Sequence, residues 1–183
     1  MDFTETKLKR AFIINANLLE DDRGGFARIF CKNEFKKIGH NKEFVQINQS
    51  YNIKSGTLRG MHYQEPPYSE IKLIRCIKGV VYDVIIDLRQ SSPTFLKWVG
   101  LELSKKNKKM LYIPEGFAHG FLTLEDNSEL IYHHTNFYEP SAERGIRFDD
   151  KIINIKWSSN INCISEKDRD LPLLTSNFKG INI

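Results

Sequence analysis

The chain has 183 residues, of which 40% are hydrophobic and 11% aromatic, so it can bury one sizeable core and is expected to form one domain. Its 27 Lys and Arg and 23 Asp and Glu residues give a formal net charge of +4, but they are interspersed throughout, which argues against nucleic-acid binding. The first residues are too polar for a secretory signal and no run of about 18 apolar residues occurs, so we expect a cytoplasmic protein without membrane contact.

Strand patterns dominate the chain from about residue 44 to 148, and helical hints are confined to 32–38 and the last thirty residues. Short apolar or alternating runs, separated by turn residues, predict strands at 44–52, 57–64, 71–78, 80–88, 96–103, 110–113, 118–124 and 129–137. This number of short strands is typical of an all-β jelly roll.

The segment 80–88 has the clearest alternation. One face would carry Val80, Tyr82, Val84, Ile86 and Leu88. Asp83 and Asp87 fall on the opposite face at the period of two, so we expect a half-buried strand.

Three cysteines occur, Cys31, Cys76 and Cys163. They are widely spaced and form no CxxC pair, which predicts neither a disulfide framework nor a zinc knuckle.

The segment 56–79 resembles the first metal-binding motif of cupin barrels, in which two histidines at HxH and a later glutamate hold a metal. His62 stands at the first histidine, but Gln64 replaces the second, and Lys72 occupies the glutamate position. An ammonium repels a divalent cation and glutamine is a poor ligand for most transition metals. The second motif, PEGFAH, keeps His119. We therefore expect no metal, and two histidines free for acid–base work.

Eight segments follow one another in order between about residues 20 and 174. They are DDRGGF at 21–26, FVQINQS at 44–50, TLRGMHYQEPP at 57–67, KLIR at 72–75, VVYDVIIDLRQSSPTF at 80–95, YIPEGFAHGF at 112–121, IYHHTNFYEPSAERGIRFDD at 131–150 and SEKDRDLPLL at 165–174.

Together these segments resemble the dTDP-4-dehydrorhamnose 3,5-epimerases, also called the RmlC-like family. The resemblance implies one cupin-type jelly-roll domain over residues 1–183 with short C-terminal helices. It also implies an epimerase that needs no cofactor and acts on a nucleotide-linked 4-keto-6-deoxy sugar in deoxysugar synthesis for cell-surface polysaccharide.

The reaction implied by the family needs a base on one side of the sugar and an acid on the other, because a 4-ketone acidifies the hydrogens on its neighbouring carbons. By resemblance, His62 is the base and Asp168 orients its ring and supports its charged form. Lys72 would stabilise the enolate oxygen, and Tyr132 would return a proton from the opposite face.

The resemblance also implies a set of substrate-binding residues, with Tyr138 stacking on the base and arginines reading the phosphates. The set is Arg23, Gln46, Asn48, Arg59, His119, Tyr138, Glu143 and Lys167. Family members are homodimers that exchange N-terminal strands, and residues 1–20 would supply such a strand here.

Two positions depart from the family pattern in its nucleotide-binding part. Arg28 stands where a glutamate is usual, and Ile47 where an aspartate is usual. The reversed charge at position 28 suggests a base other than thymine, and a GDP-linked 4-keto-6-deoxy-heptose is one candidate substrate.

Four other functions remain open on sequence grounds: an epimerase that inverts C3 alone, an isomerase that moves the ketone, a non-catalytic sugar-nucleotide-binding cupin and a metal-dependent oxygenase. The complete acid–base set favours an epimerase over the isomerase and the binding cupin, and the lost metal ligands argue against the oxygenase. Inversion of C3 alone or of both C3 and C5 depends on the fine placement of Tyr132, so both stay open at this point. The adjacent His133 and His134 have no role in the acid–base set.

Overall fold

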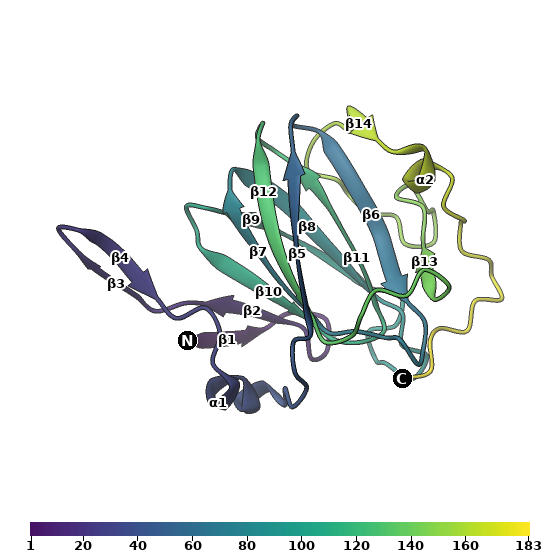
Figure 1. Ribbon diagram of the computed structural model, residues 1–183. Helices are drawn as coiled ribbons and strands as arrows, with labels where there is room; N and C mark the ends of the chain where they lie inside the picture. The colour runs from purple at the N-terminus through teal and green to yellow at the C-terminus, as the bar shows by residue number, and fades with distance from the viewer.

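The computed structural model describes residues 1–183 and contains two large β-sheets that face each other and a third sheet of two strands (Figure 1). The first sheet has the strand order β1 (Asp2–Glu5), β2 (Phe12–Asn15), β10 (Lys109–Ile113), β7 (Lys72–Lys78), β12 (Ser128–His134) and β5 (Gln46–Asn52). The second has the order β13 (Glu143–Gly145), β6 (Thr57–Gln64), β11 (Phe117–Thr123), β8 (Val80–Asp87) and β9 (Trp98–Ser104), and β14 (Cys163–Ile164) pairs with β6. The predicted all-β architecture is confirmed.

Helical structure is limited to α1 (Lys32–Phe35), the 3₁₀ turn η1 (Lys36–Ile38) and α2 (Glu166–Arg169). These segments fall within the two regions that were predicted to be helical, 32–38 and the last thirty residues. No helix is long and apolar enough to cross a membrane.

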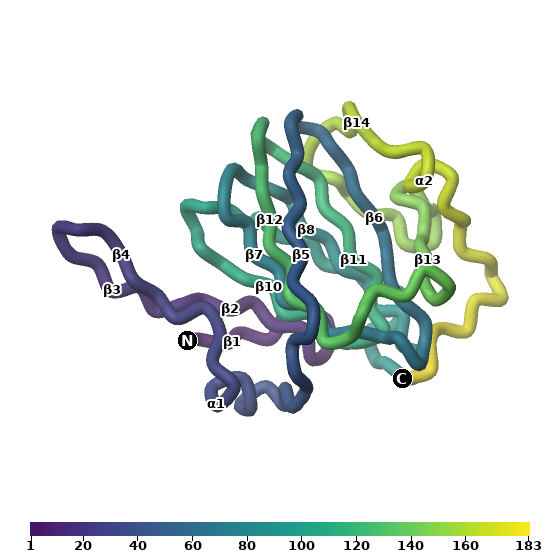
Figure 2. Tube along the Cα trace, in the orientation of Figure 1, coloured from purple at the N-terminus to yellow at the C-terminus, as the bar shows by residue number.

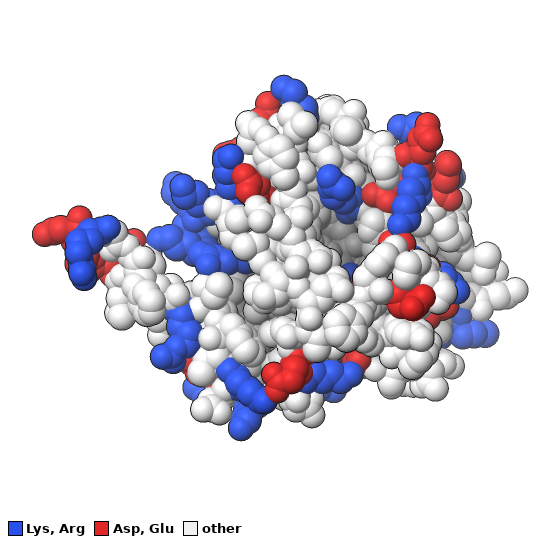
Figure 3. Space-filling view, viewed as in Figure 1, with Lys and Arg blue, Asp and Glu red and all other residues white.

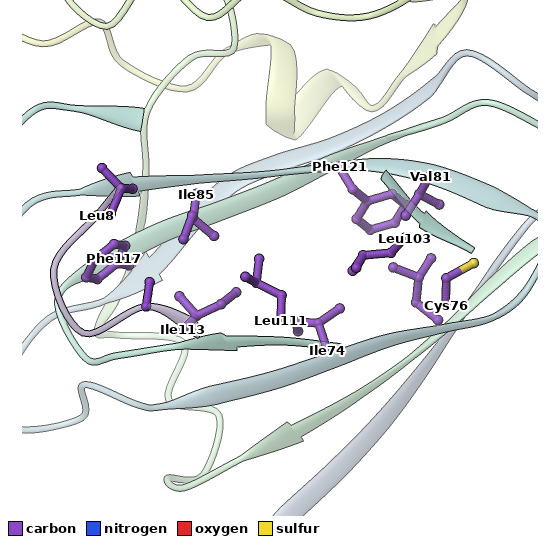
Figure 4. Close-up of a cluster of buried hydrophobic side chains, with 12 residues drawn as sticks. Leu8, Ile74, Cys76, Val81, Ile85, Leu103, Leu111, Ile113, Phe117 and Phe121 are labelled. Atoms are coloured by element: carbon purple, nitrogen blue, oxygen red, sulfur yellow. The ribbon is translucent and has the colours of Figure 1, made fainter. Parts of the chain in front are cut away.

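The main core lies between the two sheets (Figure 4). Side chains alternate between the faces of a strand, so β7 sends Ile74 and Cys76 inward while Leu73 packs on the outside against α1. Facing them from the second sheet are Ile85 and Phe121. This apolar interior fixes the distance between the sheets.

The expectation of a half-buried strand at 80–88 was wrong, because β8 is covered on both faces. Its outer residues Val84 and Ile86 pack in a second apolar cluster with Ile146, Ile153 and Ile181 from the C-terminal part of the chain. Figure 2 shows this part running along the outside of the second sheet.

The two aspartates of β8 are therefore interior residues. Asp83 and Asp87 are both 0% exposed. Asp87 is paired with Arg89 at 2.7 Å, and Asp83 accepts hydrogen bonds from His119. A buried carboxylate needs such partners.

Residues 1–20 were expected to supply an N-terminal strand. They contain β1, β2 and most of β3 (Leu18–Asp21), which forms a hairpin with β4 (Gly24–Ala27). This hairpin projects away from the barrel (Figures 1 and 2). Leu19 and Phe26 on it are 70% and 71% exposed.

Candidate active site

A bulge in β6 brings two predicted site residues to the same cavity. His119 of β11 pairs with His62, whereas Phe121, two residues on, pairs with Arg59, so β6 holds one extra residue at this point. Arg59 and His62, three positions apart, therefore both line the cavity between the sheets.

Gly60 makes this bulge possible. Its φ is +124°, and a Cβ there would lie 2.5 Å from Cα of Gly120 on the neighbouring strand. An L-residue would be strained by the backbone conformation and would also collide with main chain that has no room to move.

Gly60→Ala is therefore expected to lower the free energy of unfolding by about 2–4 kcal/mol, the sum of backbone strain and overpacking. Gly24→Ala is the matched control, because Gly24 has a φ of +125° but nothing within 4 Å of the added Cβ. It should cost about 1 kcal/mol. Urea unfolding followed by tryptophan fluorescence measures both, and equal losses would contradict the importance of the close approach.

His62 and Asp168 form a hydrogen-bonded pair. His62 Nε2 lies 2.7 Å from Asp168 Oδ1, and the main-chain N–H of Gly60 donates to Asp168 Oδ2 at 3.1 Å. Burial raises the pKa of Asp168, but the hydrogen bond and charge of His62, the N–H of Gly60 and the charge of Lys167 together hold that pKa below its ordinary value. Because an ionised carboxylate only accepts, Nε2 carries the hydrogen and Nδ1 keeps a lone pair.

Asp168 is held in place by the start of α2. Ser165 is the N-cap of this helix, and its side chain accepts from the main-chain N–H of Asp168 at 3.1 Å. The carboxylate therefore approaches β6 from a fixed direction, although it lies 106 residues from His62 in sequence.

Tyr132 approaches the cavity from the other sheet. It lies on β12, and its hydroxyl is 2.8 Å from Ser50 Oγ on β5. Burial raises the pKa of Tyr132 well above its ordinary value, so the phenol stays protonated at neutral pH. The cavity thus has a His–Asp pair on one wall and a protonated phenol on the facing sheet.

Two further polar groups belong to the same space. Lys72, at the start of β7, pairs with Glu70 at 3.2 Å. His119 Nε2 lies 3.0 Å from both carboxylate oxygens of Asp83. Sequence reasoning missed both carboxylates, although an aspartate within an apolar strand is itself a signal of a buried polar partner.

The cavity has a volume of about 390 Å³. Figure 3 shows the molecule hollowed between β5 and β6, with charged side chains around the opening. The predicted residues that line it are His62, Lys72, Tyr132, Asp168, Asn48, Arg59, His119, Tyr138, Glu143 and Lys167. The structure therefore brings together all four predicted catalytic residues and six of the predicted binding residues.

One side of the cavity carries a cluster of three predicted binding residues. Tyr138 Oη and Lys167 Nζ both donate to Glu143 Oε2, at 2.8 and 2.6 Å. These bonds raise the pKa of Tyr138 and of Lys167. The Tyr138 side chain is held by its hydroxyl while the residue stays 52% exposed, which leaves ring surface for stacking.

Two predicted binding residues lie outside the cavity lining. Gln46 is adjacent to it, donating to Asn48 Oδ1 at 3.2 Å and accepting from the Tyr138 main chain at 3.1 Å. Arg23 lies at the turn of the projecting hairpin, 90% exposed and paired with Asp21. This chain alone does not bring Arg23 to the site.

The two departures from the family pattern also lie outside the cavity. Arg28 follows the hairpin and pairs with Glu34 at 3.0 Å. Ile47 points to the opposite face of β5 from Asn48 and is 63% exposed. Neither side chain lines the cavity of its own chain.

Gln64, which stands at the position of the second cupin ligand, has a structural role. Gln64 Nε2 donates to the carbonyls of Tyr68 and Phe137, and Oε1 accepts from the main chain of Glu139. The Gln64 amide therefore connects the loop that contains Tyr68 to the loop that contains Phe137 and Glu139. No group of three or more His, Cys, Asp or Glu side chains is arranged to hold a metal ion.

A jelly-roll barrel with a His–Asp pair facing a half-buried tyrosine and a lysine defines a class of enzyme that moves protons on a small polar substrate. The chain belongs to the dTDP-4-dehydrorhamnose 3,5-epimerase family, whose model matches residues 5–176. The cupin-type fold predicted from the sequence is confirmed with it.

Individual relatives support the same assignment. A dTDP-4-dehydrorhamnose 3,5-epimerase of Shigella flexneri is 47% identical over 169 residues, 92% of this chain and 93% of the relative. The structure of the Bacillus anthracis epimerase with TDP and PPi bound is 40% identical, with a TM-score of 0.91 over 94% of this chain and 99% of that one. The Legionella pneumophila enzyme in complex with dTDP-4-keto-L-rhamnose is 34% identical, with a TM-score of 0.92 over 100% and 98%.

Proposed function

We propose that this chain inverts C3 and C5 of a thymidine-diphosphate-linked 4-keto-6-deoxy sugar, as an isomerase of deoxysugar synthesis. The observation that carries the proposal is the placement of a base and an acid on facing sheets. His62 comes from β6 of the second sheet and Tyr132 from β12 of the first. A sugar ring between them would meet the base on one face and the acid on the other.

The proton transfers follow from the hydrogen positions on His62 and Tyr132 and from the ionised state of Asp168. Nδ1 of His62 takes the hydrogen from a carbon next to the ketone, and Asp168 stabilises the imidazolium that forms. The electron pair moves onto the ketone oxygen, where the Lys72 ammonium offsets its charge. Tyr132 then gives its hydroxyl proton to the same carbon from the opposite face. His62 loses a proton to solvent and Tyr132 regains one, which restores the starting state.

Thymidine diphosphate is the nucleotide that the relatives favour. The Bacillus anthracis structure holds TDP, and the Legionella pneumophila structure holds a dTDP-linked keto sugar. The two departures that suggested a GDP-linked heptose lie outside the cavity of this chain. Tyr138, Glu143 and Lys167 provide the stacking and polar groups that a nucleotide requires.

We also propose that the protein acts as a homodimer. The β3–β4 hairpin stands free of the barrel, and its exposed Leu19 and Phe26 form an apolar surface that a second copy would cover. In such a dimer Arg23 would serve the cavity of the other chain. Analytical ultracentrifugation should give twice the chain mass, and a monomer at micromolar concentration would refute the proposal.

The cytoplasm is the proposed location. Cys31, Cys76 and Cys163 are all unpaired, as is usual for proteins in a reducing compartment.

Incubation in heavy water tests the proposed function. The wild-type protein should add two deuterons to dTDP-4-keto-6-deoxyglucose, as read by mass spectrometry, and none to a GDP-linked 4-keto-6-deoxy-heptose offered in parallel. One deuteron would indicate a C3-only epimerase. Exchange with the GDP sugar alone would overturn the nucleotide assignment, and binding without exchange would identify a non-catalytic module.

A further inference from the structure

Glu70 is a buried carboxylate in the wall of the cavity that the proposed reaction leaves without a role. It precedes β7, and its side chain is 9% exposed. One oxygen, Oε1, lies 3.2 Å from Lys72 Nζ, and the other, Oε2, lies 2.7 Å from His134 Nδ1. Lys72 and His134 are themselves only 11% and 10% exposed, so solvent does not compete for these contacts.

The carboxylate is ionised and determines the tautomer of His134. Burial raises the pKa of Glu70, but the charges and hydrogen bonds of Lys72 and His134 together hold that pKa below its ordinary value. An ionised carboxylate only accepts, so Nδ1 of His134 carries a hydrogen. Nε2 then accepts from Asn48 Nδ2, which lies 3.4 Å away.

The network reaches from the lysine to the amides of the binding wall. Asn48 Oδ1 in turn accepts from Gln46 Nε2 at 3.2 Å. His134 also stacks beside Tyr132, with the ring centroids 6.2 Å apart. Replacement of Glu70 would therefore disturb Lys72 and the side chains of Asn48 and Gln46 on β5.

Glu70 contacts both Lys72 and His134, and this affects how the Lys72 ammonium is presented to a substrate. An ammonium has three N–H donors, and Glu70 takes up one of them. The remaining donors are free to meet a ketone oxygen in the cavity. The hydrogen bond from His134 to Oε2 fixes the carboxylate beside the ammonium, and Lys72 itself lines the cavity.

We propose that Glu70 is a positioning residue of the epimerisation, which aims the Lys72 ammonium at the substrate's ketone oxygen and fixes the His134 tautomer that orients Asn48. This inference rests on the proposed function. It adds two residues, Glu70 and His134, to the set of twelve that the family resemblance implies.

The test is steady-state deuterium exchange with dTDP-4-keto-6-deoxyglucose, using wild type, Glu70→Gln and a matched control. Glutamine keeps the shape but removes the charge. We expect kcat to fall about 10–100-fold with KM changed less than about threefold, because a misplaced Lys72 ammonium loses its contact with the ketone oxygen chiefly where the enolate charge develops. Glu65→Gln is the control, since Glu65 pairs with Arg144 at 3.0 Å outside the cavity. It should match wild type.

A second variant, Lys72→Met, distinguishes positioning of the Lys72 ammonium by Glu70 from general structural support. In Lys72→Met, removal of the Glu70 charge should cost little further kcat, because Glu70 acts through the ammonium. Glu70→Asp, whose shorter side chain cannot reach both partners, should lie between wild type and Glu70→Gln.

The outcomes are distinct. If wild type exchanges deuterium and Glu70→Gln does so equally well, the role of Glu70 is overturned and the proposed function stands. The same holds if removal of the Glu70 charge lowers kcat equally in the wild-type and Lys72→Met backgrounds. Absence of exchange in wild type would overturn the proposed function itself and, with it, the inference.

Discussion

Replacement of His62 by asparagine is expected to reduce kcat by roughly 10²–10⁴-fold, the usual contribution of a general base. Asparagine can still hydrogen-bond to Asp168 but cannot accept a proton from carbon. Deuterium entry at C3 and C5 should fall together, because the same base serves both carbons that flank the ketone. Substrate affinity should change little, since the ring of His62 makes no ion pair except that with Asp168.

His133→Asn is the control for His62→Asn. His133 lies next to the cavity residue His134, but its ring packs against Phe44 on the outside of the first sheet, with centroids 5.6 Å apart. The control should retain wild-type exchange. If His62→Asn exchanged deuterium at the wild-type rate, the assignment of the base would be wrong.

Replacement of Tyr132 by phenylalanine should separate exchange from inversion. His62 would still remove a proton and return a deuteron to the same face, so label would enter the unreacted sugar. Inversion would fall by about 10²-fold or more, because no acid remains on the opposite face. Mass spectrometry measures the label, and NMR measures the epimers.

Tyr51→Phe is the matched control for Tyr132→Phe. The hydroxyl of Tyr51 donates to Asn127 at 2.8 Å, and the residue is 53% exposed at the surface. It should behave as wild type. Full inversion by Tyr132→Phe would show that another group, or water, supplies the second proton.

The barrel strands could be predicted because their patterns are local. The segment 57–64 is a strand with the predicted bounds, and β5, β7 and β12 begin within two residues of their predicted starts. The faces of β8 could not be predicted in the same way. Alternation identifies two faces, but the C-terminal residues that cover the outer one are brought there only by the fold.

In the candidate site, too, residues in local motifs could be predicted, and contacts between distant segments could not. Residues within motifs, such as His62 and Lys72, were predicted from their place in the family pattern, and the structure places them in one cavity. Asp83, the partner of His119, and Glu70, the partner of Lys72, were assigned no role in the site from the sequence, because these contacts depend on strand register. Arg23 could not be placed from one chain, because its hairpin leaves the barrel.

His62 and Tyr132 are proposed to act on opposite faces of a 4-keto sugar. Proton NMR of the wild-type reaction with dTDP-4-keto-6-deoxyglucose in heavy water tests this proposal most directly. We expect the H3 and H5 signals to disappear while the remaining couplings change to those of the inverted sugar. Loss of both signals with the original configuration retained would contradict it.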